Sequence, residues 1–188
     1  MAENTSVLTA QETFGDDPVA GVGLMADDAR VAARTLARAP RAWKDRALNL
    51  MADRIEARAD TILEANSRDL ERGRESGIST ALLDRLKLDR TRITGLADAL
   101  RELAALPDPV GSVVRGQTLA NGLRMRQVRV PMGVVGAIYE ARPNVTVDIA
   151  ALALRSGNAV VLRGGSAARD SNTVLVDVMR AALGTAGV

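Results

Sequence analysis

The segment Arg163-Gly164-Gly165-Ser166 combines residue types that suit phosphate binding. It follows a short apolar run and precedes a predicted helix, which is where open α/β sheets bind ligands. Glycines let a ligand approach the backbone closely, and an arginine side chain offers a planar pair of donors to phosphate. An ordinary tight turn with a solvated arginine has the same pattern, so the local sequence leaves both interpretations open.

Asn144 is a second candidate, because it lies between another apolar run and a predicted helix over residues 145–155. The N-terminal end of a helix favours negative charge, and a side-chain amide there can donate a hydrogen bond to a developing oxyanion. The alternative role for an asparagine at this position is a helix cap. Spacing alone favours the cap.

The composition excludes several kinds of chemistry. The chain contains neither cysteine nor histidine, so it offers no thiolate nucleophile, no disulfide and no imidazole base, and we expect no metal site. Lys and Arg number 25 against 23 acidic residues, which gives a formal net charge of +2. These charges alternate along predicted helices and aromatic residues are scarce, which is typical of a solvated, ion-paired surface. We therefore expect no nucleic-acid partner.

No apolar run approaches the roughly 18 residues that a membrane span requires. The beginning of the chain also lacks the basic and then apolar layout of a signal peptide. We expect a soluble, cytoplasmic chain with no membrane partner.

The first half of the sequence predicts helices. Residues 1–16 are polar and aperiodic, which predicts a disordered N-terminus. Residues 17–110 have helical periodicity, interrupted at Pro40 and ended by the proline-containing segment 106–109. The expected N-caps of these helices are Asp60, Ser79 and Asp89.

A β-hairpin is expected within residues 111–132. Asn121-Gly122 is a strong signal for a two-residue hairpin turn. The apolar positions that follow change from one face of the strand to the other. This change suggests a β-bulge near Arg126 or Gln127.

Residues 133–188 predict the start of a parallel, Rossmann-like sheet. Two apolar runs, each followed by a helix, indicate strands that are buried on both faces and joined by right-handed crossovers. The second helix is expected to begin at a cap on Asp170 or Ser171. Two strands cannot form a sheet that buries both faces, so we expect an incomplete α/β fold whose third strand would begin where the chain stops.

The longest distinctive motifs are YEARPNVTVD at residues 139–148 and SGNAVVLRGG at residues 156–165. Together with the segments 62–70, 82–86 and 106–111, they make the chain similar to the gamma-glutamyl phosphate reductases, or glutamate-5-semialdehyde dehydrogenases. That family belongs to the aldehyde dehydrogenase superfamily. The match covers residues 20–188 and resembles only the N-terminal part of the family's chain, which implies an incomplete aldehyde dehydrogenase-like fold.

The resemblance implies NADPH-dependent reduction of L-glutamyl 5-phosphate to L-glutamate 5-semialdehyde and phosphate, in L-proline biosynthesis from glutamate. In the superfamily a cysteine attacks the acyl carbon and forms a thioester, which divides one difficult step into two easier ones. This chain has no cysteine, so we expect it to be inactive alone, with the catalytic domain absent. The alternative is a non-catalytic nucleotide-binding or scaffolding remnant.

The resemblance also implies roles for individual residues. Asn144 falls on the asparagine that stabilises the oxyanion, which reverses the preference for a cap. Arg163 falls where many relatives have a lysine that contacts the adenosine ribose, and an arginine suits the 2′-phosphate of NADPH. Further expected contacts are Gly164, Gly165, Ser166 and the backbone of Ala141 for the cofactor, and Arg142 for the acyl phosphate or a carboxylate.

The resemblance divides the chain into functional parts. Residues 17–110 would form the helical part of the cofactor-binding domain, and residues 133–188 would begin its NADPH-binding α/β part. Residues 111–132 resemble a strand pair of the family's oligomerisation element. This similarity implies a homo-oligomer for the full-length protein.

Overall fold

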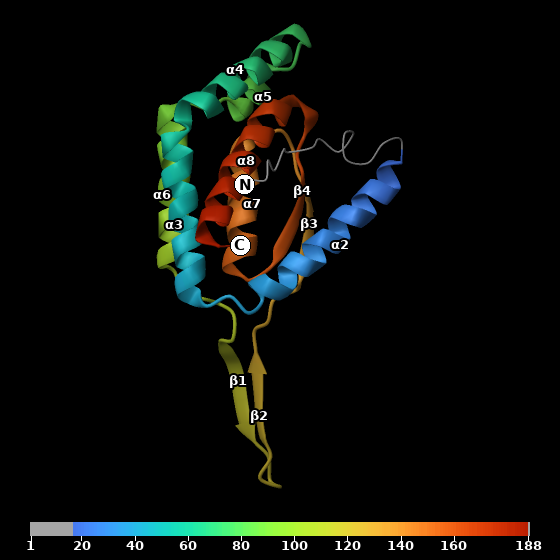
Figure 1. Ribbon diagram of the computed structural model, residues 1–188, viewed down its shortest axis with the longest axis vertical. Coiled ribbons are helices and arrows are strands. Elements are labelled where there is room, and N and C mark those ends of the chain that lie inside the picture. Colours follow the sequence, from blue (N-terminus) through green and yellow to red (C-terminus); the bar gives the residue numbers. More distant parts are fainter. Residues whose placement is uncertain (1–16, 188) are drawn as a thin grey trace, which may run out of the picture.

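The computed structural model describes residues 17–187. The predicted disordered terminus, residues 1–16, lies outside this range. The N-terminal helices are α2 (Pro18–Leu36), α3 (Arg41–Ala57), α4 (Ala59–Glu75), α5 (Thr80–Leu86) and α6 (Arg90–Ala105). They are followed by β1 (Val113–Thr118), β2 (Arg124–Val128), β3 (Val134–Ile138), α7 (Pro143–Arg155), β4 (Ala159–Arg163), the short 3₁₀ helix η1 (Ser166–Ala168) and α8 (Arg169–Ala186). Figure 1 shows a body of helices and a small sheet, from which the hairpin β1–β2 projects.

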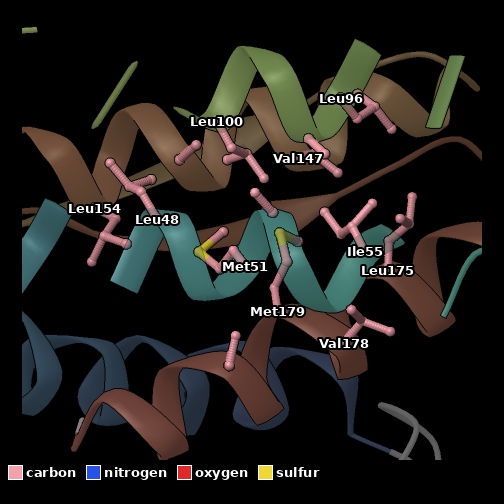
Figure 2. Close-up of a cluster of buried hydrophobic side chains, with 14 of the residues drawn as sticks. Leu48, Met51, Ile55, Leu96, Leu100, Val147, Leu154, Leu175, Val178 and Met179 are labelled. Atoms are coloured by element: carbon pink, nitrogen blue, oxygen red, sulfur yellow. The ribbon is translucent and has the colours of Figure 1, made fainter. Parts of the chain in front are cut away.

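Helix α3 forms the centre of the hydrophobic core. Its residues Leu48, Met51 and Ile55 recur at helical spacing and are almost completely buried. They face side chains of the neighbouring helices, among them Leu100 of α6 and Leu175 of α8 (Figure 2). Full burial of each such side chain contributes about 1.5–3 kcal/mol, so this core fixes α6 and α8 on either side of α3.

The only tryptophan of the chain marks the end of the α3–α8 contact. The indole N–H of Trp43 donates a hydrogen bond to the carbonyl oxygen of Ala186 over 3.0 Å. The Arg46 guanidinium donates to the same carbonyl over 2.8 Å. These two bonds satisfy a carbonyl of the last turn of α8, which has no partner within its own helix.

Two of the three predicted caps are confirmed. Ser79 and Asp89 each accept a backbone N–H from the first turn of the following helix. The prediction for Asp60 is wrong, because only Arg58 separates α3 from α4 and α4 begins one residue before Asp60. Asp60 pairs instead with Arg90 of α6.

The hairpin is confirmed, but its turn has a different form from the predicted one. Gly122 has a φ of +84°, whereas no residue other than glycine has positive φ among the described residues. A two-residue type I′ turn needs positive φ at both central residues, so Asn121 does not meet that requirement. The Gly122 N–H instead donates to Leu119 O, and the Leu119 N–H donates to Leu123 O, each over 2.9 Å, so that the loop consists of the three residues 120–122.

The bulge lies on the opposite strand from the predicted one. Val113 pairs with Val128 and Arg115 pairs with Gln127, so Val114 is the extra residue and belongs to β1. In the sequence of β2, the apolar residues change from one face of the strand to the other. This change shows where along the hairpin the pairing is irregular, but not which strand carries the additional residue. Every residue of both strands is exposed.

Strands β3 and β4 are parallel and joined through α7, as predicted. Helix α7 packs on β4, while α2 packs on both strands from the other side (Figure 1). The prediction that these strands are buried on both faces is wrong, since the Ile138 side chain is 83% exposed. Among the described residues the sheet has only these two strands, too few to be covered completely.

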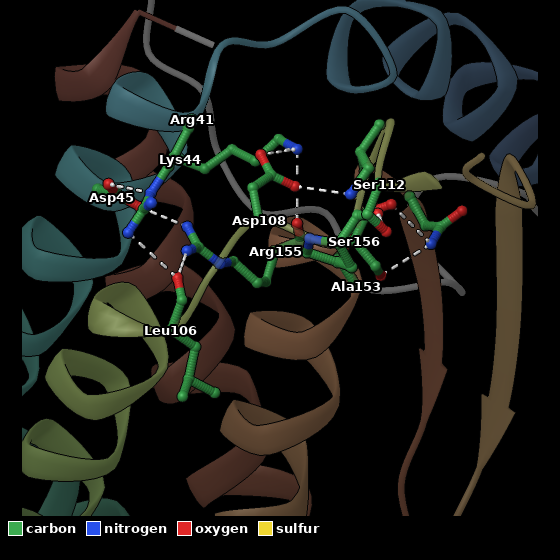
Figure 3. A network of polar contacts seen from close by, with 12 residues as sticks. Arg41, Lys44, Asp45, Leu106, Asp108, Ser112, Ala153, Arg155 and Ser156 are labelled. Atoms are coloured by element: carbon green, nitrogen blue, oxygen red, sulfur yellow. Dashed lines mark hydrogen bonds and ion pairs between the residues drawn. The ribbon is translucent and has the colours of Figure 1, made fainter. Parts of the chain in front are cut away.

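A buried polar network holds the segment from which the hairpin leaves the body (Figure 3). The Lys44 side chain is 1% exposed, and its Nζ donates to Asp108 Oδ2 over 2.8 Å. Asp108 Oδ1 in turn accepts the Val110 N–H over 2.9 Å. Arg155 of α7, also buried, pairs with Asp45 and so ties α7 to α3. Burial acts to raise the pKa of Asp108, but the hydrogen bonds from Lys44 and the Val110 N–H, together with the charges of Lys44 and Arg155, outweigh it and the pKa is lowered.

Between residues 17 and 187, none of the helices combines the length and the apolar character needed to cross a lipid bilayer.

Candidate functional site

The predicted site residues fall into two neighbouring regions around the beginning of α7. The first is a groove of about 600 Å³, which we call the α6–α7 groove. It is lined by parts of residues 84–88, by one face of α6 from Arg92 to Ala99, and by Arg142, Asn144 and Asp148. The second region is the turn from Arg163 to Ser166, between β4 and α8.

Asn144 is not the cap of α7. The helix begins at Pro143 and its N-cap is Arg142, which makes no side-chain hydrogen bond to the helix end. The Asn144 side chain is exposed to the groove, and its Nδ2 lies 3.5 Å from Asp148 Oδ2, at the limit of a hydrogen bond. The amide is therefore available to donate to a ligand in the groove.

Arg142 lines the same groove as Asn144. Its Nε lies 2.9 Å from Glu140 Oε1, so the carboxylate holds one side of the guanidinium. Arg85 Nη1 approaches the other oxygen of Glu140 at 3.7 Å. The structure thus brings a cation and an amide donor to one surface, an arrangement that suits a phosphorylated acyl group.

The Gly164-Gly165 pair has a packing explanation. Neither glycine has positive φ. A Cβ atom added to Gly164 would collide with Asn172 Nδ2, and one added to Gly165 would lie 2.9 Å from the Ala141 backbone nitrogen. Packing within an ordinary tight turn is therefore enough to explain why both positions are glycine. A bound cofactor would also require glycines here, because it must approach the backbone closely.

Arg163 and Ser166 are exposed at the edge of this turn. The Arg163 carbonyl accepts the Tyr139 N–H over 3.1 Å, which extends the pairing of β3 and β4 past their last residues. The carboxyl ends of both strands thus place Ala141 beside Arg163–Ser166. Parallel α/β sheets bind ligands at this edge.

A chain of hydroxyl and amide groups connects the two regions. Thr146 is completely buried, and its Oγ1 donates to Asn172 Oδ1 over 2.7 Å. The Tyr139 hydroxyl lies 2.7 Å from the same Thr146 oxygen and, since that oxygen's own proton is engaged, must be the donor. The end of β3, the first turn of α7 and the first turn of α8 are thereby held together. None of these three residues was predicted from the sequence as part of a site.

Helix α8 is not capped by Asp170 or Ser171 but by Asp69 of α4. The Asp69 carboxylate is completely buried and accepts the backbone N–H of Asp170 over 3.1 Å and that of Ser171 over 2.8 Å. These N–H groups lie in the first turn of α8 and have no partner within their helix. A carboxylate about 100 positions away in the sequence supplies the cap, so no local spacing rule could reveal it.

Asn66 joins this cap to the α6–α7 groove. Its Nδ2 donates to Ser171 Oγ over 3.0 Å and to Leu86 O over 2.9 Å, and its Oδ1 accepts the Leu88 N–H over 2.7 Å. Leu86 and Leu88 flank Lys87, which lines the groove. One buried amide therefore fixes both the start of α8 and one wall of the groove.

The arrangement of the helical body, the projecting hairpin and the β3–α7–β4–α8 unit is that of part of an aldehyde dehydrogenase. An NAD-dependent benzaldehyde dehydrogenase from Corynebacterium glutamicum superposes with a TM-score of 0.67, covering 87% of this chain and 33% of that chain. Its sequence identity of 24% supports the fold alone. No protein-family model matches the chain.

Within that class, the chain is similar to gamma-glutamyl phosphate reductase in particular. The reductase of Kineococcus radiotolerans is 64% identical over 160 residues, and that of Thermobifida fusca is 57% identical over 164 residues. The crystal structure of the Thermotoga maritima reductase superposes with a TM-score of 0.84 at 42% identity, covering 87% of this chain and 40% of that chain. The chain spans 37% and 39% of the two curated relatives. The resemblance inferred from the motifs is confirmed.

Proposed function

We propose that this chain supplies the cofactor-binding part and one wall of the substrate site of a gamma-glutamyl phosphate reductase. The reaction is the NADPH-dependent reduction of L-glutamyl 5-phosphate to L-glutamate 5-semialdehyde with release of phosphate, a step of L-proline biosynthesis in the cytoplasm. The 64% identity to a reductase of that name carries the proposal. The position of Arg142 and Asn144 in one groove supports it.

The residues at the ends of β3 and β4 fit a nicotinamide dinucleotide. The exposed Arg163 side chain would take the 2′-phosphate of NADPH, since guanidinium pairs with phosphate through two parallel hydrogen bonds. Gly164, Gly165 and Ser166 would line the same edge, and the Ala141 backbone would lie beneath the cofactor. When bound, NADPH supplies the hydride for the reduction.

The groove would hold the acyl phosphate. The Asn144 amide would donate to the acyl oxygen as negative charge develops there, and removal of one such donor typically costs about 100- to 1,000-fold in rate. Arg142 would face the phosphate group. Because the chain has no cysteine, the thioester-forming nucleophile must come from another part of the enzyme, and we expect no turnover from this chain alone.

The exposed hairpin would serve assembly of the full-length enzyme. A two-stranded ribbon with both faces in water is marginally stable by itself. We propose that residues 111–132 form part of the oligomerisation element of a homo-oligomer. Residues 17–110 and 133–188 would together belong to the cofactor-binding domain.

Calorimetric titration of the chain with NADPH and NADH tests the cofactor assignment. We expect Arg163→Glu to weaken NADPH binding by at least about 10-fold and NADH binding much less, as loss of a charge-assisted contact to phosphate predicts. Arg126→Glu, at an exposed arginine of the hairpin, is the matched control and should leave both affinities unchanged. Equal loss for both cofactors would exclude Arg163 from the 2′-phosphate site.

The absence of a cysteine favours a second candidate function, a nucleotide-binding or scaffolding remnant without catalysis. The intact mass of the native protein distinguishes the two. A mass well above 19.8 kDa would support the reductase. A mass of 19.8 kDa would favour the remnant.

A further inference from the structure

Asp148 presents a carboxylate without a cationic partner to the α6–α7 groove. It lies one helical turn after Asn144, on the side of α7 that faces α6, and lines both this groove and the adjoining apolar hollow beside Leu152. Within residues 17–187, no arginine or lysine contributes to the pKa of Asp148. Its polar contact is the long one from Asn144 Nδ2, at 3.5 Å.

This carboxylate has no structural task that would explain its position. It caps no helix and bridges no pair of elements among the described residues, in contrast to Asp69 and Asp108. Burial raises the pKa of Asp148, and the hydrogen bond from Asn144 only partly opposes this. Keeping a charge partly buried without a partner costs free energy, and a cationic ligand that pairs with the charge can offset this cost.

The surroundings of Asp148 restrict which cation fits. The other charged side chains of the groove are Asp84, Arg85, Lys87, Arg92 and Arg142. Asp84 pairs with Arg92, so the free carboxylate of Asp148 faces a rim that is mainly basic. One carboxylate and one amide are too few for a metal site, and the described residues contain no cluster of metal ligands. The pattern fits a small molecule that carries one ammonium group and more than one anionic group.

The spacing along α7 matches such a molecule. Asn144 and Asp148 are one helical turn apart, and Asn144 Nδ2 lies 3.5 Å from Asp148 Oδ2, so two ligand atoms that each contact one of these side chains can be about 5 Å apart. In an extended glutamyl group the carbonyl carbon and the α-nitrogen are separated by four single bonds, or about 5 Å from standard bond lengths. A glutamyl chain lying along α7 can therefore reach both side chains.

We infer that Asp148 binds the α-ammonium group of the glutamyl substrate and so makes the groove specific for an amino acid. This inference rests on the proposed function, because the acyl end must lie at Asn144. Lys87 is then the natural partner of the α-carboxylate, because Arg92 is held by Asp84 and by two backbone carbonyls. Simple acyl phosphates without an amino group would lose the contact with Asp148.

Two stable probes test this inference by NMR titration of the chain. L-2-Amino-5-phosphonopentanoate carries the ammonium, and 5-phosphonopentanoate lacks it. We expect the amino probe to bind at least about 10-fold more tightly, with shifts of the Asn144 and Asp148 amide signals, as a charge-assisted contact predicts. Asp148→Asn should remove the difference between the probes. Equal binding of the two probes to the unmodified chain would overturn the inference.

Asp177→Asn is the matched control. Asp177 lies on α8, outside the groove, and burial raises its pKa as well. The Asp177→Asn variant should still bind the amino probe more tightly than the other probe. If this variant also binds the two probes equally, the effect is not specific to Asp148. If both probes bind equally and Arg142→Ala weakens both, the substrate groove remains and only the role of Asp148 is wrong. If neither probe binds, the inference and the substrate part of the proposed function fail together.

Discussion

The Asp69 carboxylate of α4 accepts two hydrogen bonds from Ser171 of α8, one from its backbone N–H at 2.8 Å and one from its hydroxyl at 2.7 Å. The two residues are 102 positions apart in the sequence and both are completely buried. A side chain from the helical part of the chain thus determines where α8 begins. Since α8 directly follows the turn that carries Arg163, this contact also positions the proposed cofactor edge.

Replacing Asp69 by alanine should therefore destabilise the chain and loosen the start of α8. Loss of charge-assisted hydrogen bonds that leaves buried donors without a partner costs about 2–4 kcal/mol. This corresponds to a fall of about 5–15 °C in Tm for a chain of this size. Thermal unfolding followed by circular dichroism measures the change. Glu71→Ala, at an exposed residue of α4, should shift the Tm by less than 2 °C or so; equal shifts would contradict the capping role.

Asp108→Asn tests the polar network at the base of the hairpin. The pKa of Asp108 is lowered in the folded chain, so its carboxylate stabilises the fold above its ordinary pKa and this contribution is lost as the pH falls through the folded value. We expect the variant to be less stable by about 1–3 kcal/mol at neutral pH, because the buried Lys44 loses its ionic partner. The difference in urea unfolding should shrink steadily below about pH 4. A difference that is the same at neutral and acidic pH would exclude the ion pair as its cause.

Asp148→Asn should have the opposite effect on stability. The pKa of Asp148 is raised by burial, so its charged form opposes folding at neutral pH and ceases to do so once the pH falls below the ordinary pKa of an aspartate. We expect the variant to be slightly more stable at neutral pH, with a Tm higher by about 1–3 °C. The gain should disappear in acid. A lower Tm at neutral pH would mean that the carboxylate has a structural partner.

Gly164→Ala tests the close approach at the β4–α8 turn. The added methyl group would collide with Asn172 and lie 3.2 Å from the Tyr139 ring, so we expect a loss of about 1–3 kcal/mol. Gly23→Ala is the matched control, since Gly23 lies inside α2 with nothing within 4 Å of the added Cβ. That change should stabilise the chain by up to about 1 kcal/mol. The free energy of unfolding, measured with denaturant, should therefore fall for Gly164→Ala and rise for Gly23→Ala.

Elements that depend on local pattern could be predicted from the sequence. The caps at Ser79 and Asp89, the hairpin around Gly122 and the parallel β3–α7–β4 unit all follow from turn chemistry and periodicity acting over a few residues. The predictions that were wrong concern details that depend on contacts with segments distant in the sequence. The bulge, for example, could be placed on β1 only once the register with β2 was known.

The candidate site was predictable in part. The positions of Arg142 and Asn144 came from motifs, yet the groove that contains them needs α6 and the segment around Lys87, which are distant in sequence. Asn66 and Asp69 show no local sign of their roles, because a buried polar side chain is explained only by partners that the fold brings to it. Asp148 was missed for a related reason, since its unpaired charge becomes visible only in three dimensions.

The chain has one tryptophan and one tyrosine, and the fold places them at two different contacts. Trp43 is bonded to the end of α8, whereas the Tyr139 hydroxyl is bonded to Thr146 beside the β4–α8 turn. Indole fluorescence therefore reports on the docking of the last helix, and phenol absorbance reports on the proposed cofactor edge. The docking of α8 and a change at the β4–α8 turn can therefore be followed separately in the unlabelled protein, each by its own optical signal.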